Sequence, residues 1–193
     1  MGFIMEEKAW ITQWATKDHI DKKELMFSIV DQYLKSPPKC ILDIGCGLAV
    51  ESERFQKKYN SQLYLVDGDF EDTINRARKV NYGTVDSMAF YSKIEDLQKS
   101  WNSRNLNYTF INPNNMYINE DIKFDLIYSF ESCGFHYPIT TYKDFLKKHI
   151  DESTILIFDV RRKASKEQLE AFDIIDNINI TKKYDTLILK FKQ

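Results

Sequence analysis

One short stretch constrains the fold more than any other part of the chain, an apolar run that ends in two closely spaced glycines: Cys40-Ile41-Leu42-Asp43-Ile44-Gly45-Cys46-Gly47. The run 41–44 has the composition of a strand that is buried on both faces. Gly45 and Gly47 allow a sharp turn after it, and residues 49–59 have the spacing of a helix. A strand, a glycine turn and a helix in this order form the geometry of a nucleotide-type cofactor site.

The residues around the two glycines indicate which cofactor the turn suits. Val50 stands where the dinucleotide fingerprint G-x-G-x-x-G has its third glycine, which counts against a nicotinamide or flavin cofactor. Asp43 precedes Gly45 by two residues, so its carboxylate could receive the cationic amino group of an amino-acid-like ligand, directly or through water. Cys46 lies inside the turn, and its thiol is expected to pack rather than to react.

The stretch 42–47 resembles the first motif of the class I S-adenosylmethionine-dependent methyltransferases. A second apolar run, 63–67, ends in Asp67, about twenty residues beyond the glycines. An acid at the carboxyl end of a neighbouring parallel strand can accept both ribose hydroxyls, and the resemblance implies this role for Asp67. Gly68 would let the turn pass close to the sugar. Asp69 could share the role or cap the helix that follows.

The expected fold is α/β: a doubly wound, mostly parallel seven-stranded sheet with helices on both faces and a C-terminal antiparallel hairpin, as the resemblance implies. The expected strands cover 41–44, 63–67, 108–111, 124–130 and 154–160, followed by a hairpin over 177–191 that turns at Lys182-Lys183. The expected helices cover 6–33 in two pieces, 49–59, 70–79, 87–101, 140–150 with a threonine cap, and 165–172. We expect one domain, 1–193, in which residues 1–36 form an N-terminal helical cap over the site and residues 37–193 form the cofactor-binding core.

Composition narrows the class of protein. Hydrophobic residues make up 43% of the 193 and charged residues 29%, as in a globular protein. A net charge of -2 provides no overall attraction to nucleic acid. Three cysteines without C-x-x-C spacing argue against a disulfide framework and against a zinc site, and they fit a reducing compartment. The chain has no signal-peptide pattern and no run of membrane-spanning length, so we expect a cytoplasmic protein without a membrane partner.

The loop 131–138 is where the chemistry on the methyl acceptor is expected. It follows the stretch 123–127, which resembles the fourth-strand motif of the same family, and in that family the chemistry lies at the end of the strand. His136 is the candidate general base, because the pKa of an imidazole lies near working pH, and the rate should rise through such an ionisation. Glu131 is the rival base. Each has a plainer role, His136 as a packed core residue and Glu131 as a surface or capping acid.

The expected cofactor-binding residues are Asp43, Gly45, Cys46, Gly47, Asp67, Gly68, Asn112 and Phe130. Asn112 ends the third expected strand and could neighbour the adenine, and Phe130 ends the fourth. Arg161 could hold a phosphate or carboxylate of a substrate, although a solvated charge run is the plainer interpretation. His19 and His149 are expected to be solvated. No cluster of His, Asp or Glu has metal-ligand spacing, so no metal is expected.

These features predict a methyltransferase that uses S-adenosylmethionine, releases S-adenosylhomocysteine and O-methylates a small hydroxylated molecule such as a sugar. One alternative is the methylation of RNA, DNA or protein, although no basic stripe or aromatic platform for nucleic acid is visible. Another is a non-catalytic subunit that binds S-adenosylmethionine. Trp10 and Trp14 share one helix face and either pack on the sheet or help to cover the substrate.

Overall fold

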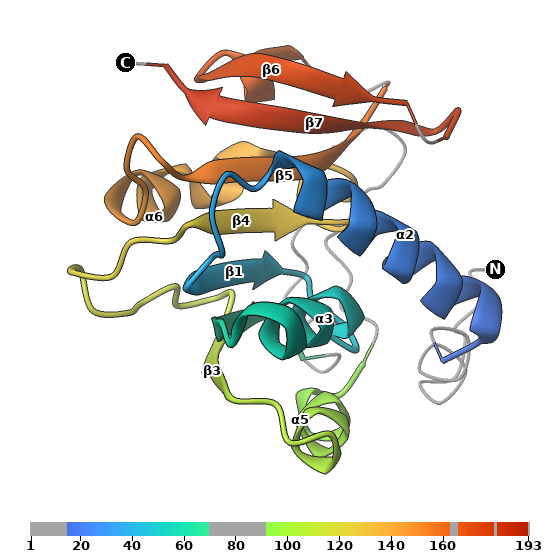
Figure 1. Ribbon diagram of the computed structural model, residues 1–193. Coiled ribbons are helices and arrows are strands. Elements are labelled where there is room, and N and C mark those ends of the chain that lie inside the picture. Colours follow the sequence, from blue (N-terminus) through green and yellow to red (C-terminus); the bar gives the residue numbers. More distant parts are fainter. Residues whose placement is uncertain (1–14, 70–91, 163–165, 180, 193) are drawn as a thin grey trace, which may run out of the picture.

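A seven-stranded sheet runs through the computed structural model, in which residues 15–69, 92–162, 166–179 and 181–192 are described (Figure 1). The strands are β1 (Cys40–Ile44), β2 (Gln62–Val66), β3 (Tyr108–Ile111), β4 (Leu126–Ser129), β5 (Ile155–Arg161), β6 (Phe172–Ile178) and β7 (Tyr184–Phe191). Their order across the sheet is β3-β2-β1-β4-β5-β7-β6. The first five strands are parallel, whereas β7 pairs antiparallel with β5 and β6. The predicted fold class is therefore confirmed.

The strand order reverses beside β1, and this reversal locates the crevice in which such sheets bind ligands. The chain runs outward from β1 through β2 to β3 and then returns to place β4 on the other side of β1. Ile41 of β1 is in register with Leu126 of β4, and Asp43 with Tyr128. The loops after β1 and β4 therefore leave the same edge of the sheet next to each other, at the switch point where a ligand can enter.

Alternate side chains of β1 bury against different helices, so the sheet has an apolar layer on each face. Leu42 and Ile44 belong to a core cluster that includes Phe145 and Leu146 from α6 (Lys143–Lys148). Ile41 belongs to a second cluster. That cluster receives side chains from α2 (Lys17–Tyr33), α3 (Val50–Tyr59) and α5 (Ile94–Ser103). Because Asp43 is two residues from Ile41, its side chain points to the face covered by α2 and α3.

The N-terminal helix α2 is docked by an apolar stripe. Met26 and Val30 are buried in the second cluster, with exposed fractions of 2% and 0%. Phe27 meets Phe55 of α3 edge to face, with 4.7 Å between the ring centroids. The helix crosses the front of the sheet beside α3 in Figure 1.

The C-terminal third of the chain differs from its predicted secondary structure in three places. The expected helix over 140–150 is a 3-10 turn, η1 (Ile139–Tyr142), followed by the short α6, and no side chain caps either element, so the predicted threonine cap is wrong. The expected helix over 165–172 is reduced to a 3-10 turn, η2 (Lys166–Leu169). The hairpin begins at Phe172 rather than at residue 177, because Phe172 pairs with Phe191 on the neighbouring strand. The centroids of the two rings lie 4.4 Å apart.

Other predicted elements are confirmed or lie outside the described residues. The helix α3 ends at Tyr59, as predicted from the sequence. The helix expected over 87–101 is present as α5, which buries Leu97 and Trp101 as its spacing predicts. The predicted helix over 70–79 and the two tryptophans of the N-terminal segment, Trp10 and Trp14, lie outside the described residues.

Candidate functional site

The glycine turn follows β1 and is hydrogen-bonded to the end of β2. Gly45 and Gly47 adopt φ angles of 74° and 49°, in the left-handed region that glycine tolerates best. The backbone N–H groups of Gly45 and Cys46 both donate to the carbonyl of Val66, at 2.7 and 3.1 Å. The turn is therefore fixed by the strand that carries Asp67, and α3 begins directly after it.

Asp67, the residue after Val66, holds the same turn through its carboxylate. Its Oδ2 accepts the N–H of Gly47 at 2.7 Å, and its Oδ1 accepts the N–H of Gly68 at 2.8 Å. Burial raises the pKa of this carboxyl to about 6 despite these two hydrogen bonds. Each carboxylate oxygen has two lone pairs, so Asp67 can still accept hydroxyl groups from a ligand while it holds the turn.

The space beside Gly45 is occupied by a side chain of the loop after β4. A Cβ atom at Gly45 would lie 1.9 Å from Oγ and 2.3 Å from Cβ of Ser132. Glycine is required here because Ser132 packs against the backbone. The sequence indicates the need for glycine, but it assigns the close approach to a ligand rather than to this serine.

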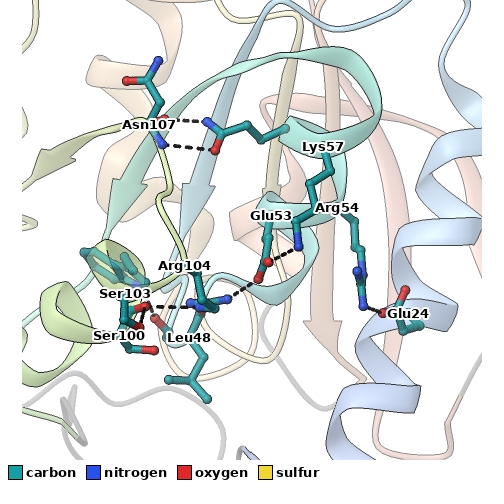
Figure 2. Close-up of polar contacts among 12 residues, drawn as sticks. Glu24, Leu48, Glu53, Arg54, Lys57, Ser100, Ser103, Arg104 and Asn107 are labelled. Atoms are coloured by element: carbon teal, nitrogen blue, oxygen red, sulfur yellow. Dashed lines mark hydrogen bonds and ion pairs between the residues drawn. The ribbon is translucent and has the colours of Figure 1, made fainter.

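Two side chains near the end of α5 fix the carbonyl groups of the turn. Trp101 donates its indole N–H to the carbonyl of Gly47 at 3.0 Å. Arg104 donates to the carbonyl of Leu48 and forms an ion pair with Glu53 of α3, as Figure 2 shows. Neither contact can be predicted from the sequence, in which the only signal for Trp101 is its position on the apolar face of a helix.

Asp43 is a buried carboxylate with two hydroxyl partners. Its Oδ2 accepts from Ser52 of α3 at 2.8 Å and from Tyr128 of β4 at 3.0 Å, and its exposed fraction is 3%. Burial and then the neighbouring charge of Glu51 raise the pKa of Asp43 to about 7. A cation brought next to this group would stabilise its ionised form.

Cations from α2 reach this edge of the sheet. Lys23 Nζ lies 2.8 Å from Oε1 of Glu51, in a pair whose side chains are only 15% and 3% exposed. The same ammonium lies 5.8 Å from the ring centroid of Phe130. Lys22 forms an ion pair with Glu131 at 2.6 Å. The predicted cofactor residue Phe130 and the predicted rival base Glu131 therefore both contact α2, and no pattern in the sequence predicts these contacts.

Glu131 has a left-handed backbone, with φ 53°. Its N–H donates to Oδ2 of Asp159 at 2.9 Å, and Oδ1 of Asp159 accepts from Thr186 at 2.6 Å. Burial alone would raise the pKa of Glu131, but the ion pair with Lys22 outweighs it and the pKa is lowered. A carboxylate that is stabilised in this way is a weak proton acceptor.

His136 lies at the same edge but does not have the predicted ionisation. Its ring meets that of Phe135 edge to face, with 4.8 Å between the centroids. Burial and then the charge of Arg161 lower the pKa of His136 to about 4. The imidazole is therefore neutral near pH 7, so the structure gives no reason to expect a rise in rate near the ordinary imidazole pKa. Arg161 is not a solvated charge, since its guanidinium lies 4.2 Å from the Phe135 ring centroid and Nε donates to the carbonyl of Phe135.

Asn112 makes a hydrogen bond within its own turn. Its side chain is exposed, and Oδ1 accepts the N–H of Asn114 at 2.8 Å. Asp69 accepts the N–H of Ile94 at 3.1 Å and so caps α5. His149 was predicted to be solvated, and this prediction is wrong because its exposed fraction is 2%. Its Nδ1 lies 2.9 Å from the carbonyl oxygen of Ile122.

The three cysteines are free thiols. Cys46 is buried in the turn and burial raises its pKa well above the ordinary value, so this thiol packs, as expected. Among the described residues, no group of three or more His, Cys, Asp or Glu side chains could hold a metal ion. None of the helices in the described ranges is long and apolar enough to cross a membrane.

Comparisons with known proteins define the fold. No protein-family model matches the chain, and no curated protein matches it. Among solved structures, the PH0226 protein from Pyrococcus horikoshii is similar with a TM-score of 0.65 and 13% identity, over 92% of this chain and 93% of that one. An S-adenosylmethionine-dependent methyltransferase from Clostridium acetobutylicum is similar with a TM-score of 0.60 and 14% identity, over 96% and 99% of the two chains. The fold of this chain is that of the class I methyltransferases.

A third similar structure is that of an enzyme whose name gives a protein as its methyl acceptor. The ribosomal protein L11 methylase from Lactobacillus delbrueckii is similar with a TM-score of 0.56 and 13% identity, over 91% of this chain and 80% of that one. At this identity the likeness shows the fold and not the methyl acceptor, which has to be inferred from the residues of the site.

Proposed function

We propose that this chain is a methyltransferase that binds S-adenosylmethionine at the glycine turn and O-methylates a small hydroxylated molecule such as a sugar. The observation that carries the proposal is the hydrogen bond from Gly47 to Asp67, which joins the two sequence motifs at the switch point of this fold. This hydrogen bond supports the proposal because it holds the glycine turn against Asp67, the acid to which we assign the ribose hydroxyls.

The residues present fit this ligand in charge. Asp43 and Asp67 are acids with raised pKa values, about 7 and about 6, because each is buried. An ammonium group beside Asp43 would favour its ionised form, and ribose hydroxyls could donate hydrogen bonds to the carboxylate of Asp67. S-adenosylmethionine supplies an electrophilic methyl group, and the chain has to hold the acceptor in line and remove its proton.

His136 supports a hydroxyl acceptor as the substrate. Burial and Arg161 keep the imidazole of His136 neutral down to about pH 4, so its ring can accept a hydroxyl proton, with a basicity close to that of a carboxylate. Glu131 is the second candidate, because the ion pair with Lys22 already occupies its carboxylate. The net charge of -2 does not favour RNA or DNA as the acceptor.

The test is a screen for methyl transfer from labelled S-adenosylmethionine to pooled metabolites, RNA and protein. We expect label in a hydroxylated small molecule. Label in RNA or protein would contradict the acceptor class, and binding without transfer to any acceptor would indicate a non-catalytic subunit.

His136 is tested on the substrate that the screen identifies. We expect His136→Gln to lower turnover by roughly 10²–10⁴-fold, the usual contribution of a positioned base, with little change in cofactor affinity. The wild-type rate should show no ionisation of His136 between about pH 6 and 8, because the group is deprotonated above about pH 4. Undiminished turnover of the variant would contradict the assignment.

A further inference from the structure

Tyr184, the first residue of β7, carries a buried hydroxyl group that has no hydrogen-bond partner among the described residues. The residue is only 1% exposed. Thr186, two positions further along the strand, is also buried, but its hydroxyl donates to Oδ1 of Asp159 at 2.6 Å. Buried hydroxyl groups are nearly always hydrogen-bonded, because an unpaired one loses the bonds that water would make. The hydroxyl of Tyr184 therefore calls for a partner that the ligand-free chain does not supply within its described part.

Tyr184 lies at the edge of the sheet that carries the candidate base. It pairs in register with Arg161 at the end of β5. Its ring meets that of Phe135 edge to face, with 5.5 Å between the centroids, and Phe135 meets the ring of His136 in the same way at 4.8 Å. Because Phe135 contacts both rings, Tyr184 and the candidate base belong to one cluster beyond β4 and β5.

The side chains over Tyr184 are ones that a small molecule could displace. Nζ of Lys22 lies over the tyrosine ring, 5.7 Å from its centroid, and pairs with Glu131. The side chains of this ion pair are 32% and 34% exposed, and Phe135 is also partly exposed. None of the three belongs to either core cluster. Their rearrangement would open a path to the hydroxyl while the sheet stays intact.

The surroundings of this hydroxyl suit a neutral polar group. Burial and then the charges of Asp159 and Glu131 raise the pKa of Tyr184, so the phenol keeps its proton and can both donate and accept. An anionic group would approach these two acids, and a cationic group would approach Lys22. The two nearby cations are already engaged, Lys22 by Glu131 and Arg161 by the carbonyl of Phe135. A hydroxyl group is repelled by none of them.

We propose that the hydroxyl of Tyr184 hydrogen-bonds a second hydroxyl group of the methyl acceptor, so that the enzyme selects polyhydroxylated acceptors over those with a single hydroxyl group. The inference rests on the proposed function, because that function places the acceptor beside His136. Tyr184 is then a specificity-determining residue, and it comes from β7, outside the parallel part of the sheet.

Tyr184→Phe tests the inference, because it removes the hydroxyl group and keeps the ring. The probes are two defined pools, one of sugars and polyols and one of compounds with a single hydroxyl group, each offered with labelled S-adenosylmethionine. The wild type should label the sugars and polyols, and Tyr184→Phe should lower this labelling about 10-fold, as expected for the loss of one hydrogen bond. The variant should bind S-adenosylhomocysteine as tightly as the wild type.

Thermal unfolding of the ligand-free protein supplies a second readout. Because the hydroxyl has no partner among the described residues, Tyr184→Phe should unfold at the same temperature as the wild type or at a higher one. The control is Tyr64→Phe. Tyr64 is a buried tyrosine of β2 whose ring meets that of Phe124 edge to face, with 5.2 Å between the centroids. The control should label both pools as the wild type does.

Three outcomes would overturn the inference and leave the proposed function intact. A lower unfolding temperature for Tyr184→Phe would show that the hydroxyl already has a partner within the protein. Undiminished labelling of the sugars and polyols by this variant would show that the hydroxyl does not contact the acceptor. Wild-type labelling confined to the compounds with a single hydroxyl group would show that no second hydroxyl is needed. The absence of label from both pools, with the wild type folded, would overturn both proposals.

Discussion

At the scale of single residues, buried carboxylates dominate the candidate site. Asp43, Asp67 and Asp159 lie at the carboxyl edge of the sheet, and burial raises the pKa of each, to about 7, 6 and 7. A carboxyl that is harder to ionise in the folded than in the unfolded state destabilises the fold once the pH exceeds its unfolded pKa. The protein therefore keeps acids here at a cost in stability, as expected of residues retained for binding.

Asp43→Asn should separate stability from binding. The pKa of Asp43 is 3.8 in the unfolded chain and about 7 in the folded one. The contribution of Asp43 to the free energy of unfolding therefore falls as the pH rises between these two values. The variant should be more stable than the wild type at pH 8, by about 1 kcal/mol or more, and should bind S-adenosylhomocysteine more weakly. Thermal unfolding at pH 5 and pH 8 measures the first effect, and calorimetry the second. Lower stability of the variant at pH 8 would contradict the assigned penalty.

Substitution of Gly45 tests whether Ser132 is the reason that the turn needs a glycine. A methyl group at Gly45 would collide with Ser132, so Gly45→Ala should destabilise the fold by about 1–2 kcal/mol or more through the clash and the positive φ. Ser132→Gly in the same chain should recover part of this loss, because it removes both atoms that a Cβ would meet. Denaturant titration of the single and double variants measures the coupling. Strictly additive effects would show that Ser132 does not cause the clash.

At the scale of elements, α2 and α5 shape the site from outside the sheet. The helix α5 fixes the carbonyl groups of the glycine turn through Trp101 and Arg104, while α2 brings Lys22 and Lys23 to the acids beyond β1 and β4. Neither helix carries a recognised motif. The contacts of α5 hold the glycine turn in place, and those of α2 pair with acids beside it.

Trp101→Phe tests the contribution of α5. The substitution keeps a ring at a fully buried position but removes the indole N–H that Gly47 accepts. We expect a loss of about 1–3 kcal/mol of stability, the cost of leaving the buried carbonyl unpaired, together with weaker S-adenosylhomocysteine binding. The control is Trp101→Leu, which also lacks the N–H and should be no better at binding. Full wild-type affinity in Trp101→Phe would show that the turn keeps its shape without the helix.

At the scale of the whole molecule, the sequence predicts what depends on local pattern. The apolar runs of β1 and β4 and the acids that follow the strands are readable because strands of a parallel sheet are buried on both faces. The start of β6 is not, since Phe172 joins the sheet only through its pairing with Phe191. The contact of Trp101 with Gly47 and of Lys23 with Glu51 could not be predicted, because helix spacing identifies a buried face but not the loop that it meets.

The measurement that tests the central claim most directly is a calorimetric titration of S-adenosylhomocysteine into the wild type, Asp67→Asn and Asp176→Asn. Asp67→Asn should weaken binding by at least about 10-fold, because ribose hydroxyls lose charge-assisted hydrogen bonds in the crevice. Asp176→Asn changes an acid on the exposed face of β6 and should bind like the wild type. Equal affinities for the wild type and Asp67→Asn, with both proteins folded, would contradict the assignment of this edge of the sheet as the cofactor site.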